Sequence, residues 1–354
     1  MKGRNFGIDS LKSVSMLMII VLHVLGVGGI LTGIDNNSAT NNAAWLLETV
    51  NICAVNCFGI VSGYVLCRGH YRRSRLLSLW LRVVFESLIV TVAFAIFLPA
   101  SVKTHEWILV FTPVIHEEFW YFTAYFALFI FVPYINKMIA SLSKREIISL
   151  GLSVVVVFTI LGNITQHDVF HIQGGYSFLW ILCLYIIGAC LRNVEINDSI
   201  NKYWYLGAYF LCVATAWGYM KLMQLEAVLN YESPLILFAA ILLFLFFSRL
   251  EFKSAFLQKA INMLSRTSFG VYIIHTNPLI WINLLGGRFV GYVKYPVPIT
   301  IAAVVLTAVA IYAVCTLGDW LVEKFFKLIR IDLLEAAFDN LGKKKLITGE
   351  NNKI

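Results

Sequence analysis

The sequence has 354 residues, of which 59% are hydrophobic and 14% are charged, and its mean hydropathy is +0.78. Soluble domains carry about 25% charged residues, so this composition excludes a protein whose surface lies mainly in water. The formal net charge is +8.

The apolar residues occur in long blocks that are suited to crossing a membrane. A helix of about 20 apolar residues crosses a hydrocarbon layer roughly 30 Å thick. Only helices and closed barrels satisfy their backbone groups there, and barrel strands alternate apolar and polar residues, which the continuous block 235–247 does not. We therefore predict an all-α, polytopic integral membrane protein with about ten transmembrane helices. The predicted spans are 11–31, 45–67, 76–98, 119–139, 147–163, 177–191, 203–220, 234–249, 267–285 and 298–322.

The basic residues are unevenly distributed over the predicted loops. If the N-terminus is cytoplasmic, all but four of the 28 Lys and Arg residues fall on the cytoplasmic side; the four are Lys103, Lys221, Arg288 and Lys294. Cytoplasmic loops are enriched in Lys and Arg, so both termini are predicted to be cytoplasmic. The net charge then reflects topology and contact with anionic membrane lipids, and no nucleic acid partner is expected.

The chain is predicted to form one membrane domain, 1–330, followed by a basic cytoplasmic tail, 331–354. No soluble module or Pro/Ser-rich linker interrupts it. The seven cysteines all lie in or beside predicted spans, so no disulfide framework is expected. Cys53 and Cys57 share a helix face without a nearby histidine, so no metal site is expected either.

Two histidines lie near the middle of predicted spans, where ionisable groups are costly and therefore functional candidates. His23 lies about 18 Å into the first span. Lys12 precedes it by nearly three full helical turns, so the two share a face, and Asp9 lies one turn before Lys12. His275, in the ninth span, lies at a similar depth and is predicted to face the same cavity. The alternatives are that His23 only packs against a neighbouring helix and that His275 only shapes the site.

Arg82 and Glu86 lie four residues apart in the third span and are predicted to form a structural ion pair. The loop between the second and third spans contains Arg68, His70, Arg72, Arg73 and Arg75. Positive-inside charge explains part of this run. Its density favours a cytosolic anion site, because guanidinium groups bind phosphates in bidentate fashion.

The approach to the fourth span contains Glu117, Glu118, Trp120 and Tyr121. The aromatic residues could belong to an interfacial belt. Together with the carboxylates they would also suit a sugar, which stacks on rings and donates hydrogen bonds from its hydroxyl groups.

Several of these motifs resemble membrane-bound acyltransferase family three. In that family a basic residue, commonly arginine, is followed by ten positions and a histidine; here these are Lys12 and His23. The lysine removes the bidentate contact that an arginine could make. The resemblance covers nearly the whole chain and continues through Phe58–Tyr64, Arg72-x-x-Arg75, Phe119-Trp120-Tyr121 with Pro133, and Gly270–His275.

The resemblance implies a membrane O-acyltransferase. It would move an acyl group, usually acetyl, from cytosolic acyl-CoA to a hydroxyl of a cell-surface polysaccharide or its lipid-linked precursor, as in O-acetylation of exopolysaccharide or cell wall. His23 would be essential, with Lys12 as its partner. The donor, acetyl-CoA, would be held by Arg72 and Arg75 beside Arg68, with no bound cofactor. Relatives often carry a fused extracytoplasmic domain, and none lies in these residues. The protein would therefore acylate its acceptor directly or through a separate extracytoplasmic transferase, in a bacterial plasma membrane.

Two chemical routes remain open from the sequence. His23 could be a general base that takes the proton of a sugar hydroxyl, or it could form an acyl-histidine intermediate. Tyr272 and Asn56 are candidate donors to the developing oxyanion. A different class of function, a proton-coupled transporter of a small solute, also fits about ten spans and two buried histidines.

Overall fold

The computed structural model describes residues 4–33, 38–69, 71–164, 168–194 and 199–350, with side chains up to residue 340. All regular structure in these residues is helical, which confirms the predicted all-α class. The α-helices are α1 (Phe6–Leu25), α2 (Ala39–Asn51), α3 (Ala54–Leu66), α4 (Ser74–Phe97), α5 (Thr104–Phe111), α6 (Trp120–Ser141), α7 (Lys144–Val155), α8 (Gly162–Ile164), α9 (Phe178–Asn193), α10 (Lys202–Met223), α11 (Pro234–Ser248), α12 (Ala255–Thr276), α13 (Pro278–Ile280), α14 (Val297–Leu328) and α15 (Ile331–Glu350).

Each predicted span falls on helical structure, although several are interrupted. The predicted span 45–67 is divided between α2 and α3. The span 147–163 changes from α7 to a π-helix at Val156–Leu161, and 267–285 ends in a second π-helix at Trp281–Leu285. Within the described residues, seven helical segments are long and apolar enough to cross a membrane. The protein is therefore a polytopic membrane protein, and the total of about ten spans remains a prediction.

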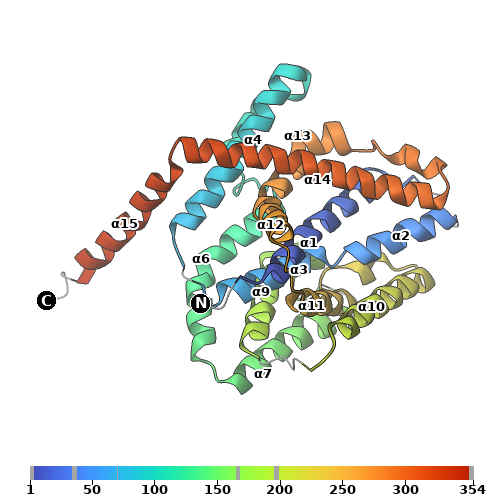
Figure 1. Ribbon diagram of the computed structural model, residues 1–354, viewed down its shortest axis with the longest axis horizontal. Helices are drawn as coiled ribbons and strands as arrows, with labels where there is room; N and C mark the ends of the chain where they lie inside the picture. Colours follow the sequence, from blue (N-terminus) through green and yellow to red (C-terminus); the bar gives the residue numbers. More distant parts are fainter. Residues whose placement is uncertain (1–3, 34–37, 70, 165–167, 195–198, 351–354) are drawn as a thin grey trace.

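α1 lies in the interior of the bundle and the other helices surround it (Figure 1). In its most apolar stretch, 72% of the residues are buried, against 22% in α14. α1 packs against α2, α3, α11, α12 and α14. The outer face of α14 instead presents Leu306, Val314 and Leu317 to the surroundings, as expected of a helix that faces lipid.

Polar residues at the helix starts explain where several helices begin. The Asn5 side chain accepts a hydrogen bond from the Ile8 N–H at the start of α1 (3.2 Å). Ser38, Ser177 and Ser254 cap α2, α9 and α12 in the same way. These side chains satisfy backbone N–H groups that have no partner within the helix.

α3 and α9 approach closely because small residues lie at their crossing. A Cβ atom on Gly63 would lie 1.9 Å from the Tyr185 carbonyl oxygen, and one on Gly188 would lie 2.0 Å from the Ile60 carbonyl oxygen. Gly59 and Gly63 are four residues apart, the spacing that lets membrane helices approach backbone to backbone. This contact fixes α3, which carries part of the cavity wall described below.

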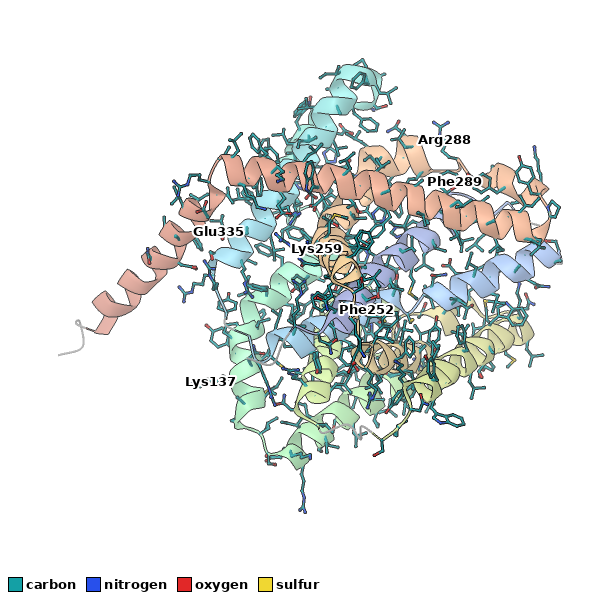
Figure 2. All side chains as sticks on the ribbon, in the orientation of Figure 1. Lys137, Phe252, Lys259, Arg288, Phe289 and Glu335 are labelled. Atoms are coloured by element: carbon teal, nitrogen blue, oxygen red, sulfur yellow. The ribbon has the colours of Figure 1, made fainter. Side chains whose placement is uncertain are left out.

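The two ends of the bundle carry different loops. Figure 2 shows Lys137, at the end of α6, and Glu335, on α15, on the left of the view, with Arg288 and Phe289 towards the upper right. The sequence assigned Lys137 to the cytoplasmic side and Arg288 to the outer side. They lie apart in this view, and the orientation with both termini in the cytoplasm remains a prediction.

Candidate active site

A cavity of about 670 Å³ lies beside α1, bounded by α2, α3, α4, α6 and α12. Lys12 and His23 both line it, as expected for two residues on one face of a helix. Its walls are mostly apolar and aromatic, with few ionisable groups, which is typical of ligand sites. The ionisable and aromatic lining residues are Lys12, His23, Glu48, Phe58, Glu118, Phe119, Trp120, Tyr121, Tyr125, Tyr176, Tyr231, Phe269, Tyr272 and Trp281.

The two predicted histidines are in direct contact. His23 Nδ1 lies 2.9 Å from His275 Nε2, and His275 Nδ1 lies 2.5 Å from the Val271 carbonyl oxygen. A carbonyl oxygen can only accept, so His275 Nδ1 carries the hydrogen and, in the neutral ring, Nε2 is the acceptor. His23 Nδ1–H then donates to it. The tautomer that results leaves His23 Nε2 with a free lone pair.

The surroundings of the two rings are different. His23 lines the cavity, and its ring meets the Trp281 ring edge-on with centroids 4.7 Å apart. His275 is 1% exposed and does not line the cavity. His23 is therefore the histidine that a bound molecule can touch, and His275 holds its orientation.

Lys12 belongs to a small polar group where α1 begins. Its Nζ lies 3.9 Å from Asp9 Oδ1, and Asp9 also pairs with Arg4 and accepts a hydrogen bond from Ser265 Oγ (3.2 Å). Among the described residues that line the cavity, Lys12 is the one lysine or arginine. It lies about 17 Å from His23 along the helix axis, because eleven residues rise about 1.5 Å each.

The loop arginines do not converge on one point. Arg75 lies within electrostatic range of the hydroxyl of Tyr125, which lines the cavity. Arg68 donates to Asn193 Oδ1 (2.8 Å) and so joins the end of α3 to the end of α9. His70 lies outside the described residues.

Arg72 is engaged by the C-terminal helix. Its Nε donates to Asp339 Oδ2 (3.1 Å). The N–H and hydroxyl of Ser74, at the start of α4, donate to the same carboxylate (2.9 and 2.8 Å). The Ser74 N–H, with its hydroxyl and the Arg72 guanidinium, holds the pKa of the Asp339 carboxyl below its ordinary value. α15 thus covers one of the two arginines of the Arg72-x-x-Arg75 motif.

Of the four residues predicted for the acceptor side, three line the cavity: Glu118, Trp120 and Tyr121. Glu117 is exposed, has a positive φ of 51°, and does not line it. Burial raises the pKa of the Glu118 carboxyl to about 7.

Other lining residues were not identified from the sequence. Glu48 is an acidic residue inside the predicted span 45–67. Ionisable residues within a membrane span are functional candidates, as for His23, so the sequence could have identified Glu48 as well. Tyr176 and Tyr231 join Trp120 in a ring cluster, with centroids 4.7 Å (Trp120–Tyr176), 4.9 Å (Tyr176–Tyr231) and 6.2 Å (Trp120–Tyr231) apart. They come from segments distant in sequence, and no local pattern predicts this contact.

The proposal that Asn56 donates to an oxyanion is not supported by its contacts. Its Nδ2 donates to the Tyr231 carbonyl oxygen (2.7 Å), and its Oδ1 accepts from Trp180 Nε1 (3.0 Å). Asn56 is fully buried and does not line the cavity. It holds the backbone of Tyr231, whereas Tyr272, the other candidate, does line the cavity.

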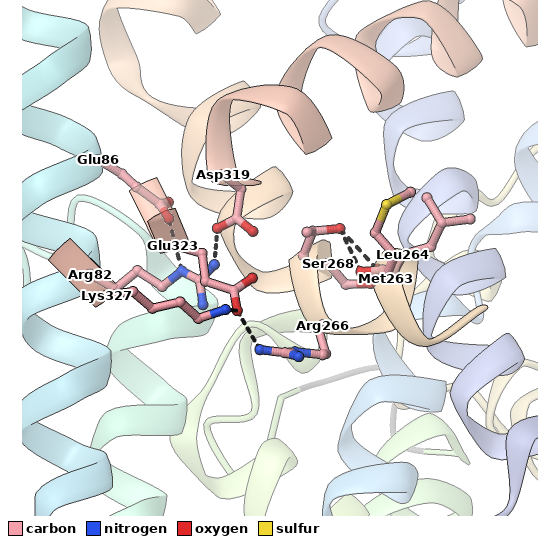
Figure 3. A network of polar contacts seen from close by, with 10 residues as sticks. Arg82, Glu86, Met263, Leu264, Arg266, Ser268, Asp319, Glu323 and Lys327 are labelled. Atoms are coloured by element: carbon pink, nitrogen blue, oxygen red, sulfur yellow. Dashed lines mark hydrogen bonds and ion pairs between the residues drawn. The ribbon is translucent and has the colours of Figure 1, made fainter. Parts of the chain in front are cut away.

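A buried charge network supports α12 from behind (Figure 3). Arg82 Nε donates to Glu86 Oε1 (3.0 Å), which confirms the predicted ion pair, and Arg82 also pairs with Asp319 on α14. Both carboxylate side chains are completely buried. The two carboxylates lie against α12 at Gly270, where a Cβ atom would lie 1.9 Å from Asp319 Oδ1. Gly270 precedes Val271, whose carbonyl orients His275, so this network helps to position the histidine pair.

Comparison with known families agrees with this site. No curated protein and no solved structure gave a match. The family described as an acyltransferase domain matches residues 5–317, which include Lys12, both histidines and the whole cavity lining. The chain therefore belongs to acyltransferase family three, and is a membrane acyltransferase.

Proposed function

We propose that the protein transfers an acyl group, acetyl in the first instance, from cytosolic acyl-CoA to a hydroxyl group of a cell-surface polysaccharide or its lipid-linked precursor. The observation that carries the proposal is the His23–His275 pair beside a cavity large enough for a ligand. The proposed location is a bacterial plasma membrane, with both chain ends in the cytoplasm.

In the proposed reaction His23 Nε2 is the general base. It takes the proton of the acceptor hydroxyl while the hydroxyl oxygen attacks the thioester carbonyl. The carbon–sulfur bond breaks, and the CoA thiolate leaves and recovers the proton from His23. The products are an ester and free CoA, so atoms and charge balance. Tyr272, which lines the cavity, is a candidate donor to the carbonyl oxygen.

His275 would stabilise the charge that His23 acquires. When Nε2 of His23 gains a proton, the Nδ1–H of the resulting imidazolium still donates to His275 Nε2 (2.9 Å). His275 in turn donates to the Val271 carbonyl (2.5 Å). Two aligned dipoles thus face the positive ring, a role that a carboxylate fills in other histidine-dependent enzymes.

The ends of the cavity suit different substrates. Lys12, with Arg75 near Tyr125, offers positive charge for the phosphates of CoA. Glu118, Trp120 and Tyr121 offer hydrogen-bond acceptors and flat rings, which suit a sugar. We place the donor at the first group and the acceptor at the second, so that they meet at His23.

The test uses the protein in lipid vesicles with radiolabelled acetyl-CoA and a mixed glycan acceptor. We expect label transfer in the wild type and its loss in His23→Ala, with His105→Ala, an exposed histidine on α5, as the matched control. Equal CoA turnover in all three proteins would overturn the role of His23. Solute flux without consumption of acetyl-CoA would favour a proton-coupled transporter instead.

The same preparation separates the two chemical routes. With acetyl-CoA and no acceptor, an acyl-histidine intermediate would release a burst of free CoA that matches the amount of enzyme. Absence of this burst, with turnover once acceptor is added, would support direct transfer with His23 as base.

A further inference from the structure

The end of the cavity that contains Trp120, Tyr176 and Tyr231, here named the aromatic end, also contains two acidic residues. Glu48 lies on α2 within electrostatic range of the Tyr231 hydroxyl, and Glu118 is two residues before Trp120. They are the only acidic residues among those that line the cavity in the described part of the chain. The charge at this end is therefore negative or neutral, because Lys12, the lysine among the described lining residues, lies where α1 begins.

Both carboxyl groups have hydrogen-bonding capacity left over. The Oε2 atoms of Glu48 and Glu118 are buried, and neither has a hydrogen-bond partner in the described structure. A buried carboxyl oxygen without a partner is costly, and native structures usually satisfy it. Since each of these atoms belongs to a residue that lines the cavity, a ligand in the cavity is an available partner.

The aromatic cluster is held rigidly. Tyr176 Oη donates to Tyr231 Oη (3.3 Å), and the Tyr231 backbone accepts from Asn56 Nδ2 (2.7 Å). Trp120 and Tyr231 are nearly parallel, at 17°. Fixed rings provide apolar contact area at little entropic cost, while the carboxyl groups supply acceptors for a ligand that is rich in hydroxyl donors.

We propose that Glu48 and Glu118 select the acceptor by charge: they accept hydrogen bonds from an uncharged, hydroxyl-rich sugar ring and exclude a ring that carries a carboxylate or phosphate. This inference rests on the proposed function and adds the substrate class to it. A carboxylate brought to this end meets the two carboxyl groups of Glu48 and Glu118, and like charges placed together in a binding site discriminate strongly between partners. A hydroxyl group at the same position gains a partner instead.

The test compares two acceptor pools that carry hydroxyl groups or carboxylates at the primary positions, and the variants below separate the effect of charge from the loss of those hydroxyl groups. A neutral oligosaccharide pool is divided, and the primary hydroxyl groups of one half are oxidised to carboxylates. At pH 9, well above the pKa of about 7 of the Glu118 carboxyl, we expect kcat/KM for the neutral pool to exceed that for the acidic pool by at least about tenfold.

Three variants assign this preference to residues. Glu48→Gln and Glu118→Gln are expected to reduce the neutral-to-acidic ratio to below about threefold, mainly through a lower KM for the acidic pool. Glu117→Gln, the adjacent exposed residue outside the cavity, should leave the ratio unchanged. A wild type that prefers the acidic pool, or glutamine variants that keep the full ratio, would overturn the proposal.

Calorimetric titration of the wild-type protein with each pool gives a second measurement that requires no variant to fold and no turnover. Weaker binding of the acidic pool is expected, and equal binding would contradict the inference. Absence of CoA release with every pool would instead count against the proposed function, while the titration would still test charge selection.

Discussion

The buried network of Arg82, Glu86 and Asp319 allows a test of how charge is balanced inside the bundle. One guanidinium faces two carboxyl groups, both with no exposed side-chain surface. Glu86 Oε2 and Asp319 Oδ2 are buried without hydrogen-bond partners. Two ionised carboxylates and one arginine would leave an uncompensated negative charge inside the bundle, where charge is poorly solvated. Charge balance therefore predicts that one of the two carboxyl groups holds a proton.

Two substitutions that each remove one charged side chain should therefore differ in how much stability they cost. Arg82→Met leaves two buried carboxyl groups without their cation, and removing one partner of a buried pair costs about 3–5 kcal/mol. Glu86→Gln leaves a balanced pair of Arg82 and Asp319, and the amide oxygen of glutamine can still accept from Arg82 Nε. We expect this second substitution to cost less than about 1 kcal/mol.

The assay is denaturant unfolding of each protein in mixed lipid–detergent micelles, followed by tryptophan fluorescence. Since about 1.4 kcal/mol corresponds to a factor of ten, the two variants should differ at least about tenfold in their unfolding equilibrium constants. Equal losses of stability would contradict this account, because they would show that the Glu86 carboxyl contributes as much to stability as the Arg82 guanidinium.

Three further predictions concern the site and its supports. His275→Phe should keep the fold but lower kcat by about 10²-fold or more, because His23 loses the acceptor that fixes its tautomer; unchanged kcat in the vesicle assay would contradict this. Gly63→Ala should lower the free energy of unfolding by about 1–3 kcal/mol, since the new methyl group would overlap the backbone of α9. A thermal unfolding midpoint equal to that of the wild type would contradict this, because α3 and α9 could then move apart at no cost. The contact of Asp339 with Ser74 should stabilise the docking of α15 at pH values above the ordinary aspartate pKa of about 3.9, and this stabilisation should be lost as the pH falls through the lowered pKa of the folded protein. At low pH the tail should then be cleaved by a protease as fast as the tail of Asp339→Asn, and protection of the wild-type tail in acid would refute this prediction.

The sequence predicted the helices well because their apolar blocks match the thickness of a membrane. It did not predict the break between α2 and α3. No proline or glycine marks this break, and the Val50 carbonyl beside it accepts a hydrogen bond from the Tyr209 hydroxyl (2.5 Å), which comes from α10. A partner so distant in the chain leaves no local signal.

The candidate site was predicted in part. The depth of His23 and His275 in their helices was sufficient to predict that the two residues lie near each other, because depth and helix face follow from residue spacing alone. The prediction that both face the cavity was wrong for His275, which is buried behind His23 and does not line it. Partners that depend on tertiary packing were not predictable. Asp319 on α14 forms an ion pair with Arg82, and Asp339 on the C-terminal helix α15 forms one with Arg72. The charge pattern of the arginine loop shows where an anion could bind, but it does not show that the chain supplies one of its own.

The histidine pair also limits the kind of chemistry that the cavity can support. The hydrogen-bond chain from His23 ends at the Val271 main-chain carbonyl and not at a carboxylate. An imidazolium there would be stabilised only by dipoles, and a charge buried in this way is costly. In the proposed reaction the proton must therefore stay on His23 only briefly. A thioester donor suits this requirement, because a thiol has an ordinary pKa of about 8.5 and its thiolate leaves without strong acid assistance. The geometry of the pair thus favours transfer from a thioester over transfer from an oxygen ester, whose alkoxide would need a far stronger acid.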